Sequence, residues 1–243
     1  MLQQTQVSTV LGYYARFLER FPDVRALAVA ETDEVMALWG GLGYYSRARN
    51  LHRCAQVVVE HHGGEFPSTA AVLETLPGIG ASTAAAIASF CFGERVSIVD
   101  GNVRRVLTRL LAFEGDLAQT GPQRRLWELA QALLPNNPSA DDMTAYTQGL
   151  MDLGATVCTR SRPACGRCPM QGICQGHQTG EPQRFPVKTR AAKRRHESWW
   201  LLFVKIDDGR PRFWLQRRPA SGIWAGLFCP PVFESEQAAR ATL

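Results

Sequence analysis

The chain has 243 residues, of which 45% are hydrophobic; it can bury a substantial core, which argues against intrinsic disorder. Lysine and arginine outnumber aspartate and glutamate by 27 to 22, and the net charge of +5 favours a polyanionic partner. No stretch approaches the ~20 apolar residues of a membrane span, and the N-terminus lacks the residue order of a signal peptide. The seven cysteines, four of them clustered, argue against a disulfide scaffold and predict a reducing compartment, the bacterial cytoplasm or nucleoid.

Apolar residues recur at helical spacing over most of residues 1–157, which predicts an almost entirely α-helical first domain. The first stripe consists of Val7, Val10, Leu11, Tyr14, Phe17 and Leu18. A second stripe covers residues 48–58 and is followed by two glycines at 63 and 64, which favour helix termination. Further stripes lie at 103–110 and 126–133. We expect each stripe to face a core.

Residues 76–80 read Leu-Pro-Gly-Ile-Gly and lie between two helical stripes. The glycines Gly78 and Gly80 permit positive φ and let the backbone approach a ligand closely. Their N–H groups, added to the positive end of the following helix, would bind a DNA phosphate. An ordinary tight turn explains the Gly-x-Gly equally well. The flanking Leu-Pro and the helices on both sides favour the DNA-binding hypothesis.

Asp100 stands at the start of another predicted helix, in the sequence Val-Asp-Gly-Asn-Val. As an N-cap it would accept hydrogen bonds from the first free N–H groups of that helix. The same carboxylate can stabilise the positive charge that develops on a sugar C1′ when a base leaves. The two roles are compatible, and the residues alone favour the N-cap role by itself.

Four cysteines lie within 17 residues, separated by loop-breaking prolines and glycines. They are Cys158, Cys165, Cys168 and Cys174. Such clustering is not expected of inert core cysteines, and tetrahedral sulfur sites hold zinc or an iron–sulfur cluster. The spacing by itself does not separate the two.

The composition changes after this cluster. Residues 182–195 contain six lysines and arginines and no acid, which predicts a basic, solvated linker over 182–198. Residues 199–205 and 212–217 then have the composition of two strands joined across Asp-Asp-Gly, a hairpin signal. A second, β-containing domain is therefore expected over 199–243, and its short length suggests that it is incomplete.

The hairpin, the aspartate and the cysteine loop, in this order over residues 1–180, resemble those of the helix-hairpin-helix DNA glycosylase superfamily that includes endonuclease III. The resemblance implies a mostly α glycosylase core at 1–157, with the helix-hairpin-helix at 76–90 and an iron–sulfur loop at 158–181. It also implies that the four cysteines hold a [4Fe–4S] cluster and that Asp100 is the catalytic residue.

Residues 1–7 (Met-Leu-Gln-Gln-Thr-Gln-Val) and 41–50 resemble stretches of the MutY-type adenine glycosylases in this superfamily. Where endonuclease III-like bifunctional enzymes carry a nucleophilic lysine, position 82 is serine, which favours a monofunctional enzyme. The residues expected to contact double-stranded DNA are Gln4, Thr5, Tyr44, Gly78, Gly80, Ser82 and Asn102. For Tyr44 the alternative is a buried aromatic side chain.

This resemblance implies an enzyme of base excision repair that removes adenine mispaired with 8-oxoguanine or guanine, acting as a monomer and away from membranes. Residues 214–219 and 221–227 resemble the opening hairpin of the α/β Nudix-like domain with which the family reads 8-oxoguanine. The expected architecture is thus a mostly α core, a cluster loop, and the start of a Nudix-like domain.

Two alternatives stay open. One is an endonuclease III-like glycosylase for oxidised pyrimidines, which Ser82 and the extra domain disfavour. The other is a non-catalytic DNA-binding fragment, because the family's glutamate that protonates adenine falls two residues before the position of Met1. Glu19, the first acidic residue, does not match that motif. We therefore expect a fragment truncated at both ends, with impaired catalysis.

Overall fold

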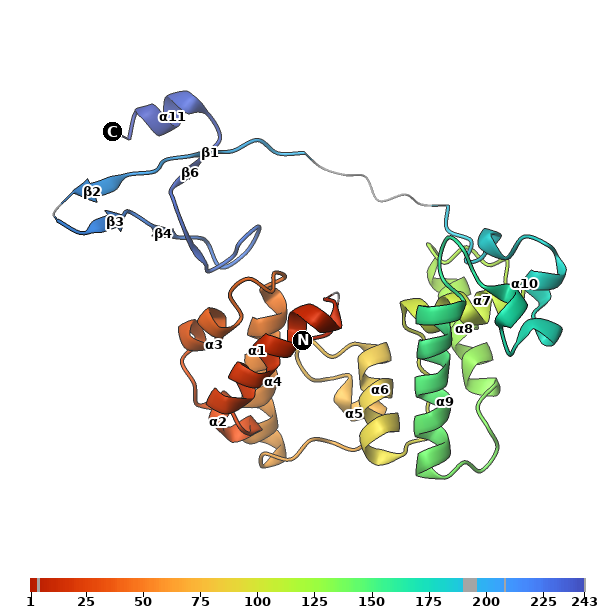
Figure 1. The fold of residues 1–243 in the computed structure, drawn as a ribbon. Helices are drawn as coiled ribbons and strands as arrows, with labels where there is room; N and C mark the ends of the chain where they lie inside the picture. The colour runs from red at the N-terminus through yellow and green to blue at the C-terminus, as the bar shows by residue number, and fades with distance from the viewer. Residues whose placement is uncertain (4, 190–195, 208, 243) are drawn as a thin grey trace. The chain divides into compact units, whose positions relative to one another are not determined.

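The computed structural model describes residues 1–3, 5–189, 196–207 and 209–242 (Figure 1). Contacts divide the chain into two units, Met1–Ala191 and Ala192–Leu243, and each is described by itself. The first unit is predominantly helical, as its apolar periodicity predicts. Among the described residues, no helix has both the length and the apolar character needed to cross a bilayer.

The α-helices of the first unit are α1 (Val7–Arg20), α2 (Val24–Ala28), α3 (Thr32–Leu38), α4 (Ser46–His62), α5 (Ala70–Leu73), α6 (Ala81–Phe92), α7 (Gly101–Leu110), α8 (Thr120–Ala132), α9 (Ala140–Asp152) and α10 (Gln175–Gln178). A π-helical turn, η1 (Leu153–Val157), continues α9. Short 3₁₀ turns follow at η2 (Cys165–Arg167), η3 (Gln171–Ile173) and η4 (Pro182–Arg184). The cysteine loop is therefore built from single turns, which suits its prolines and glycines.

Helix α1 buries only part of its predicted apolar stripe. Phe17 is buried and packs edge-on against Phe21 and Trp39, with ring centroids 5.0 and 6.2 Å apart. Val10 is also buried. The stripe residues that stay exposed are Val7, Leu11, Tyr14 and Leu18. The prediction that the whole stripe faces a core is wrong for these four, because the contact with Trp39 at the end of α3 covers the side of α1 that carries Phe17.

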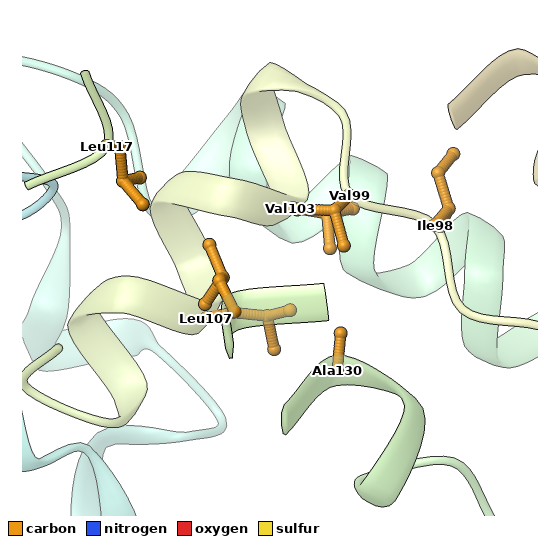
Figure 2. Packing of buried hydrophobic residues seen from close by; sticks show 7 residues of the cluster. Ile98, Val99, Val103, Leu107, Leu117 and Ala130 are labelled. Atoms are coloured by element: carbon orange, nitrogen blue, oxygen red, sulfur yellow. The ribbon is translucent and has the colours of Figure 1, made fainter. Parts of the chain in front are cut away.

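Two clusters of buried side chains organise the first unit. One joins α4, α5 and α6 and consists of Cys54, Val58, Leu73, Leu76, Ala84 and Ala88. The other surrounds α7 and α8 and consists of Ile98, Val99, Val103, Leu107, Leu117, Leu126 and Ala130. In Figure 2, Val103 and Leu107 lie on the side of α7 that faces Ala130 of α8. Helix α9 lies alongside α6 (Figure 1), where buried Ser89 and Thr147 share a hydrogen bond of 2.9 Å.

Residues 182–189, which the composition places in a solvated linker, pack on the helical unit. Phe185 is 2% exposed, and the backbone N–H of Leu117 donates to the Val187 carbonyl at 3.1 Å. The Thr189 side chain donates to the Asp116 carboxylate, and this hydrogen bond is the main reason that the pKa of Asp116 falls to about 2. A few specific contacts decide this packing, and a charge count does not detect them.

In the second unit the described strands are short and pair antiparallel. The pairs are β1 (Trp200–Leu201) with β6 (Val232–Phe233), β2 (Lys205–Asp207) with β3 (Pro211–Phe213), and β4 (Gln216–Arg217) with β5 (Phe228–Cys229). Helix α11 (Glu236–Arg240) contacts β1 and β6. The expected hairpin is confirmed in the antiparallel pairing of β2 with β3. Its base differs from the prediction, because β1 pairs with β6. The Nudix-like character of this unit stays a prediction.

Two substitutions on α1 compare the stability contributed by its buried side with that of its exposed side. We expect Phe17→Ala to lower the free energy of unfolding by about 3–5 kcal/mol, because it empties a packed aromatic site. Leu11→Ala, on the exposed side of the same helix, should change it by no more than about 0.5 kcal/mol. Urea unfolding followed by circular dichroism measures both values. Equal losses would mean that the exposed side of α1 is covered in solution.

Candidate functional site

The two glycines of the hairpin differ in their conformations. Gly78 has φ 78°, and a Cβ there would lie 2.6 Å from Cβ of Asn50 on α4, so the turn needs glycine. Gly80 is the N-cap of α6 with φ −96°, a conformation open to any residue, and a Cβ there would meet open space. The expectation of positive φ is therefore correct for Gly78 only. Gly80 leaves room in front of the positive end of α6.

Tyr44 is presented on the surface by a strained loop. Its side chain is 63% exposed, so the alternative of a buried aromatic is wrong. Its φ is 46°, in the left-handed region, and Gly41 and Gly43 also have positive φ. The indole N–H of Trp39 donates to the Gly43 carbonyl at 3.1 Å and ties the loop to the core.

The N-terminal segment lies against the same region. The Gln3 amide donates to the Thr83 hydroxyl on α6 at 3.3 Å, and the Thr5 hydroxyl accepts from Arg47 at 3.0 Å. Gln4 lies outside the described residues. Ser82, half-buried in the first turn of α6, is next to Thr83. The structure thus gathers the N-terminal segment and the hairpin near the loop of Tyr44.

The N-terminal segment and the hairpin line a cavity of about 690 Å³, together with Trp39 and Arg47, which flank the Tyr44 loop. Its walls are mostly apolar and include the exposed side of α1; the apolar lining includes Val7, Leu11, Tyr14, Leu51, Phe66, Ile79 and Ile87. Among its polar lining residues are Gln3, Arg47 and Thr83. A large apolar cavity with a few polar groups is typical of a site for a small organic ligand. Within the described part of the chain, neither Asp100 nor Asn102 lines this cavity.

Asp100 is the N-cap of α7, as predicted. Its Oδ1 accepts from the backbone N–H groups of Asn102 at 3.0 Å and Val103 at 2.7 Å. The Asn102 side chain faces the protein: its Oδ1 accepts from Arg105 at 2.8 Å, and its Cβ lies where a Cβ on Gly154 would come within 2.7 Å. The beginning of α7 is therefore joined to the π-helical turn that leads into the cysteine loop.

The four predicted cysteines line one small cavity together with Arg109. Burial raises the pKa of the Cys165 thiol, and the neighbouring thiols of Cys158, Cys174 and Cys168 raise it further. No group of three His, Cys, Asp or Glu side chains in the described part of the chain could hold a single metal ion. Four cysteine thiolates around one cavity are the ligand set with which proteins hold an iron–sulfur cluster. The donor set therefore fits such a cluster.

Arg109 connects α7 to the cysteine loop. It is 2% exposed. Its guanidinium donates to the Sγ of Cys158 at 3.3 Å and to four carbonyl oxygens, those of Cys158, Thr159, Arg160 and Phe185. Its own carbonyl lies so close to Gly176 that a Cβ there would come within 2.5 Å. One side chain thus satisfies the backbone at the start of the loop and the segment after it.

Three arginines that bind segments of the site were not predicted from the sequence: Arg47, Arg105 and Arg109. Arg105 donates to the carbonyls of Cys158 at 2.7 Å and Gly154 at 2.5 Å, beside Arg109. Arg105 and Arg109 are four residues apart and so lie on one helix face, a signal that the sequence did contain. Arg47 had no such signal, since its partners come from residues 1–5 and 39–44.

The family model of the HhH-GPD superfamily base excision DNA repair protein matches residues 1–133, which include the hairpin, the Tyr44 loop and Asp100. The model of the iron-sulfur binding domain of endonuclease III matches residues 158–174, which run from the first to the last of the four cysteines.

Similar proteins include the adenine DNA glycosylase of Buchnera aphidicola from Acyrthosiphon pisum, 33% identical over 98% of this chain and 66% of the relative. The human adenine DNA glycosylase is 46% identical over 76% of this chain and 33% of its own length. The chain thus spans about two thirds or less of these relatives. A solved thermostable thymine-DNA glycosylase matches 73% of this chain and 80% of its own, with a TM-score of 0.62 and 27% identity.

The contacts of Arg109 generate a prediction on cofactor retention. Arg109→Met should weaken the hold on iron by about 10–100-fold, because the substitution removes a partner of Cys158 and leaves buried carbonyls unsatisfied. Iron and sulfide per protein after gel filtration measure the effect. Arg124→Met, on the exposed surface of α8, is the control. Full iron content in Arg109→Met would contradict this role.

Proposed function

The chain belongs to the HhH-GPD superfamily of base excision DNA repair proteins, and we propose that it is the core of an adenine DNA glycosylase. This membership confirms the predicted mostly α fold and, with the match at residues 158–174, the iron–sulfur site. The proposed reaction is hydrolysis of the N-glycosidic bond of adenine mispaired with 8-oxoguanine or guanine in double-stranded DNA. The names of the similar bacterial and human proteins support adenine as the base.

The observation that carries the proposal is the exposed Tyr44 on a strained loop, near a large apolar cavity and the hairpin. An enzyme that acts on a base must take it out of the stack, place it in a pocket and support the remaining duplex. The open space at Gly80 provides a backbone site for a phosphate. Tyr44 provides an aromatic surface for the disturbed stack, and the cavity provides room for a purine.

Asp100 is proposed as the carboxylate that stabilises the positive sugar as the base leaves. Both cap hydrogen bonds are accepted by Oδ1, which leaves Oδ2, within the described part of the chain, for the substrate. The N-cap bonds fix the carboxylate in place before the reaction, which is the condition for electrostatic stabilisation. With serine at position 82, the attacking group is water, and the enzyme is monofunctional.

The cysteine loop would be held together by the cluster through Cys158, Cys165, Cys168 and Cys174. When bound, such a cluster supplies structural support and a redox-active centre. We further propose that the chain acts as a monomer in the cytoplasm, and that its second unit reads the base opposite adenine. The strand pairs and aromatic residues of that unit are compatible with this role.

The role of Asp100 is tested by Asp100→Asn. Asparagine is an equally good N-cap, so the fold should stay intact while the negative charge is lost. We expect single-turnover excision of adenine from an A·8-oxoguanine duplex to slow by about 10²–10³-fold. Ser82→Ala should retain the wild-type rate. If the wild-type chain binds the duplex without excising adenine, the DNA-binding alternative is supported instead.

A second pair of substitutions tests the role of the hairpin in binding DNA. Gly80→Val should fold normally, since its Cβ has open space, but should weaken duplex binding by about 10-fold by blocking a charge-assisted hydrogen bond to phosphate. The loss should be equal for matched and mismatched duplexes. Gly78→Ala should lower the melting temperature, because it meets both positive φ and Asn50. A Gly80→Val effect confined to mismatched duplexes would contradict phosphate binding.

A further inference from the structure

The guanidinium of Arg47 joins two segments that are distant in sequence. Arg47 lies in the first turn of α4. Its Nη1 donates to the carbonyl of Met1 at 2.7 Å and to that of Gln3, and its Nη2 donates to the Thr5 hydroxyl at 3.0 Å. The same Nη2 donates to the carbonyls of Leu42 and Gly43, each at 3.3 Å. One planar group therefore binds the N-terminal segment and the loop of Tyr44 at once.

The aromatic rings on both sides of this loop also contact Arg47. Its Cζ lies 5.3 Å from the ring centroid of Trp39 and 5.6 Å from that of Tyr44, within cation–π range. The Gly43 carbonyl accepts from both Trp39 and Arg47. Arg47 thus touches the exposed aromatic ring itself and the backbone immediately before it.

The loop needs such support. A residue with a Cβ rarely adopts the left-handed φ of 46° that Tyr44 has, and it keeps it only when the surroundings determine it. The carbonyls of residues 42 and 43 are fixed by the guanidinium, which limits how the next residue can turn. Lysine could not hold both segments in this way, because its ammonium group lacks the planar set of N–H donors with which Arg47 reaches five oxygens.

We infer that Arg47 is a positioning residue that locks the N-terminal segment and the Tyr44 loop into one surface before DNA arrives. It does this without acting on the reacting bond. The inference rests on the proposed function, since Tyr44 is assigned there to the DNA, and the sequence predicts that Thr5 of the N-terminal segment contacts it too. Fixing both in advance removes the cost of ordering them on binding and keeps the extruded base in register with the cavity.

The first experiment does not depend on activity. Amide hydrogen exchange followed by mass spectrometry is measured on the full chain for peptides covering residues 2–7 and 40–46. Arg47→Met should speed exchange in both peptides together, and Arg47→Lys should speed it less. Arg53→Met, exposed on the same helix, is the matched control and should leave both peptides unchanged. Faster exchange in only one peptide, or in neither, overturns the lock.

The second experiment asks whether Arg47 acts through Tyr44. At saturating enzyme, Arg47→Met should slow single-turnover excision from an A·8-oxoguanine duplex by about 10²-fold, the loss that a misplacement of about 1 Å produces. Tyr44→Ala and the double variant complete a cycle. If Arg47 positions Tyr44, the double variant loses much less than the product of the two single losses. Multiplying losses would mean that Arg47 contributes only to general stability.

The outcomes distinguish a failure of the proposed function from a failure of the inference about Arg47. If the wild-type chain excises no adenine, the proposed function fails, while the exchange experiment still decides whether Arg47 locks the two segments. If the wild-type chain is active and Arg47→Met is equally active, the inference fails alone. If Arg47→Met does not fold, Arg47→Lys carries both measurements, with an intermediate loss expected and a wild-type result against the inference.

Discussion

The arrangement of α7 and the cysteine loop in the first unit depends on the hydrogen bonds of the buried Arg109. A buried guanidinium is tolerated only when its donors are satisfied, and Arg109 has sulfur and carbonyl partners at the start of the cysteine loop and at Phe185. These partners hold α7, the cysteine loop and the segment after it in one arrangement. Because Asp100 is the N-cap of α7, the same helix holds the proposed catalytic carboxylate at its start and the cysteine loop through Arg109.

A second arginine has a comparable role at the other end of the unit. Arg47 binds backbone carbonyls of two segments, as Arg109 does, but it is half-buried and lines the apolar cavity. In both places a planar side chain with five N–H groups replaces regular secondary structure as the partner of loop carbonyls. The regions assigned to DNA and to the cluster are therefore irregular in backbone yet well defined.

The packing of α6 against α9 connects the region of the hairpin with the region of the cysteine loop. This contact, which includes the buried Ser89–Thr147 pair, joins the buried side chains around α4 to those around α7. The hairpin lies at the start of α6, and α9 runs into the π-helical turn before Cys158. A change in the way these two helices pack would therefore move the hairpin relative to the cysteine loop.

Features that depend on neighbours along the chain can be predicted from the sequence. They are the helical periodicity, the helix stop at Gly63, the N-cap at Asp100, the pairing of β2 with β3 and the set of four cysteines. Motif order then identified the superfamily. Packing in three dimensions set the exposure of four of the six α1 stripe residues, the burial of Phe185 and the pairing of β1 with β6. It also set which loops Arg47 and Arg109 bind, because their partners lie 42 to 76 residues away or on loops whose course no local pattern sets.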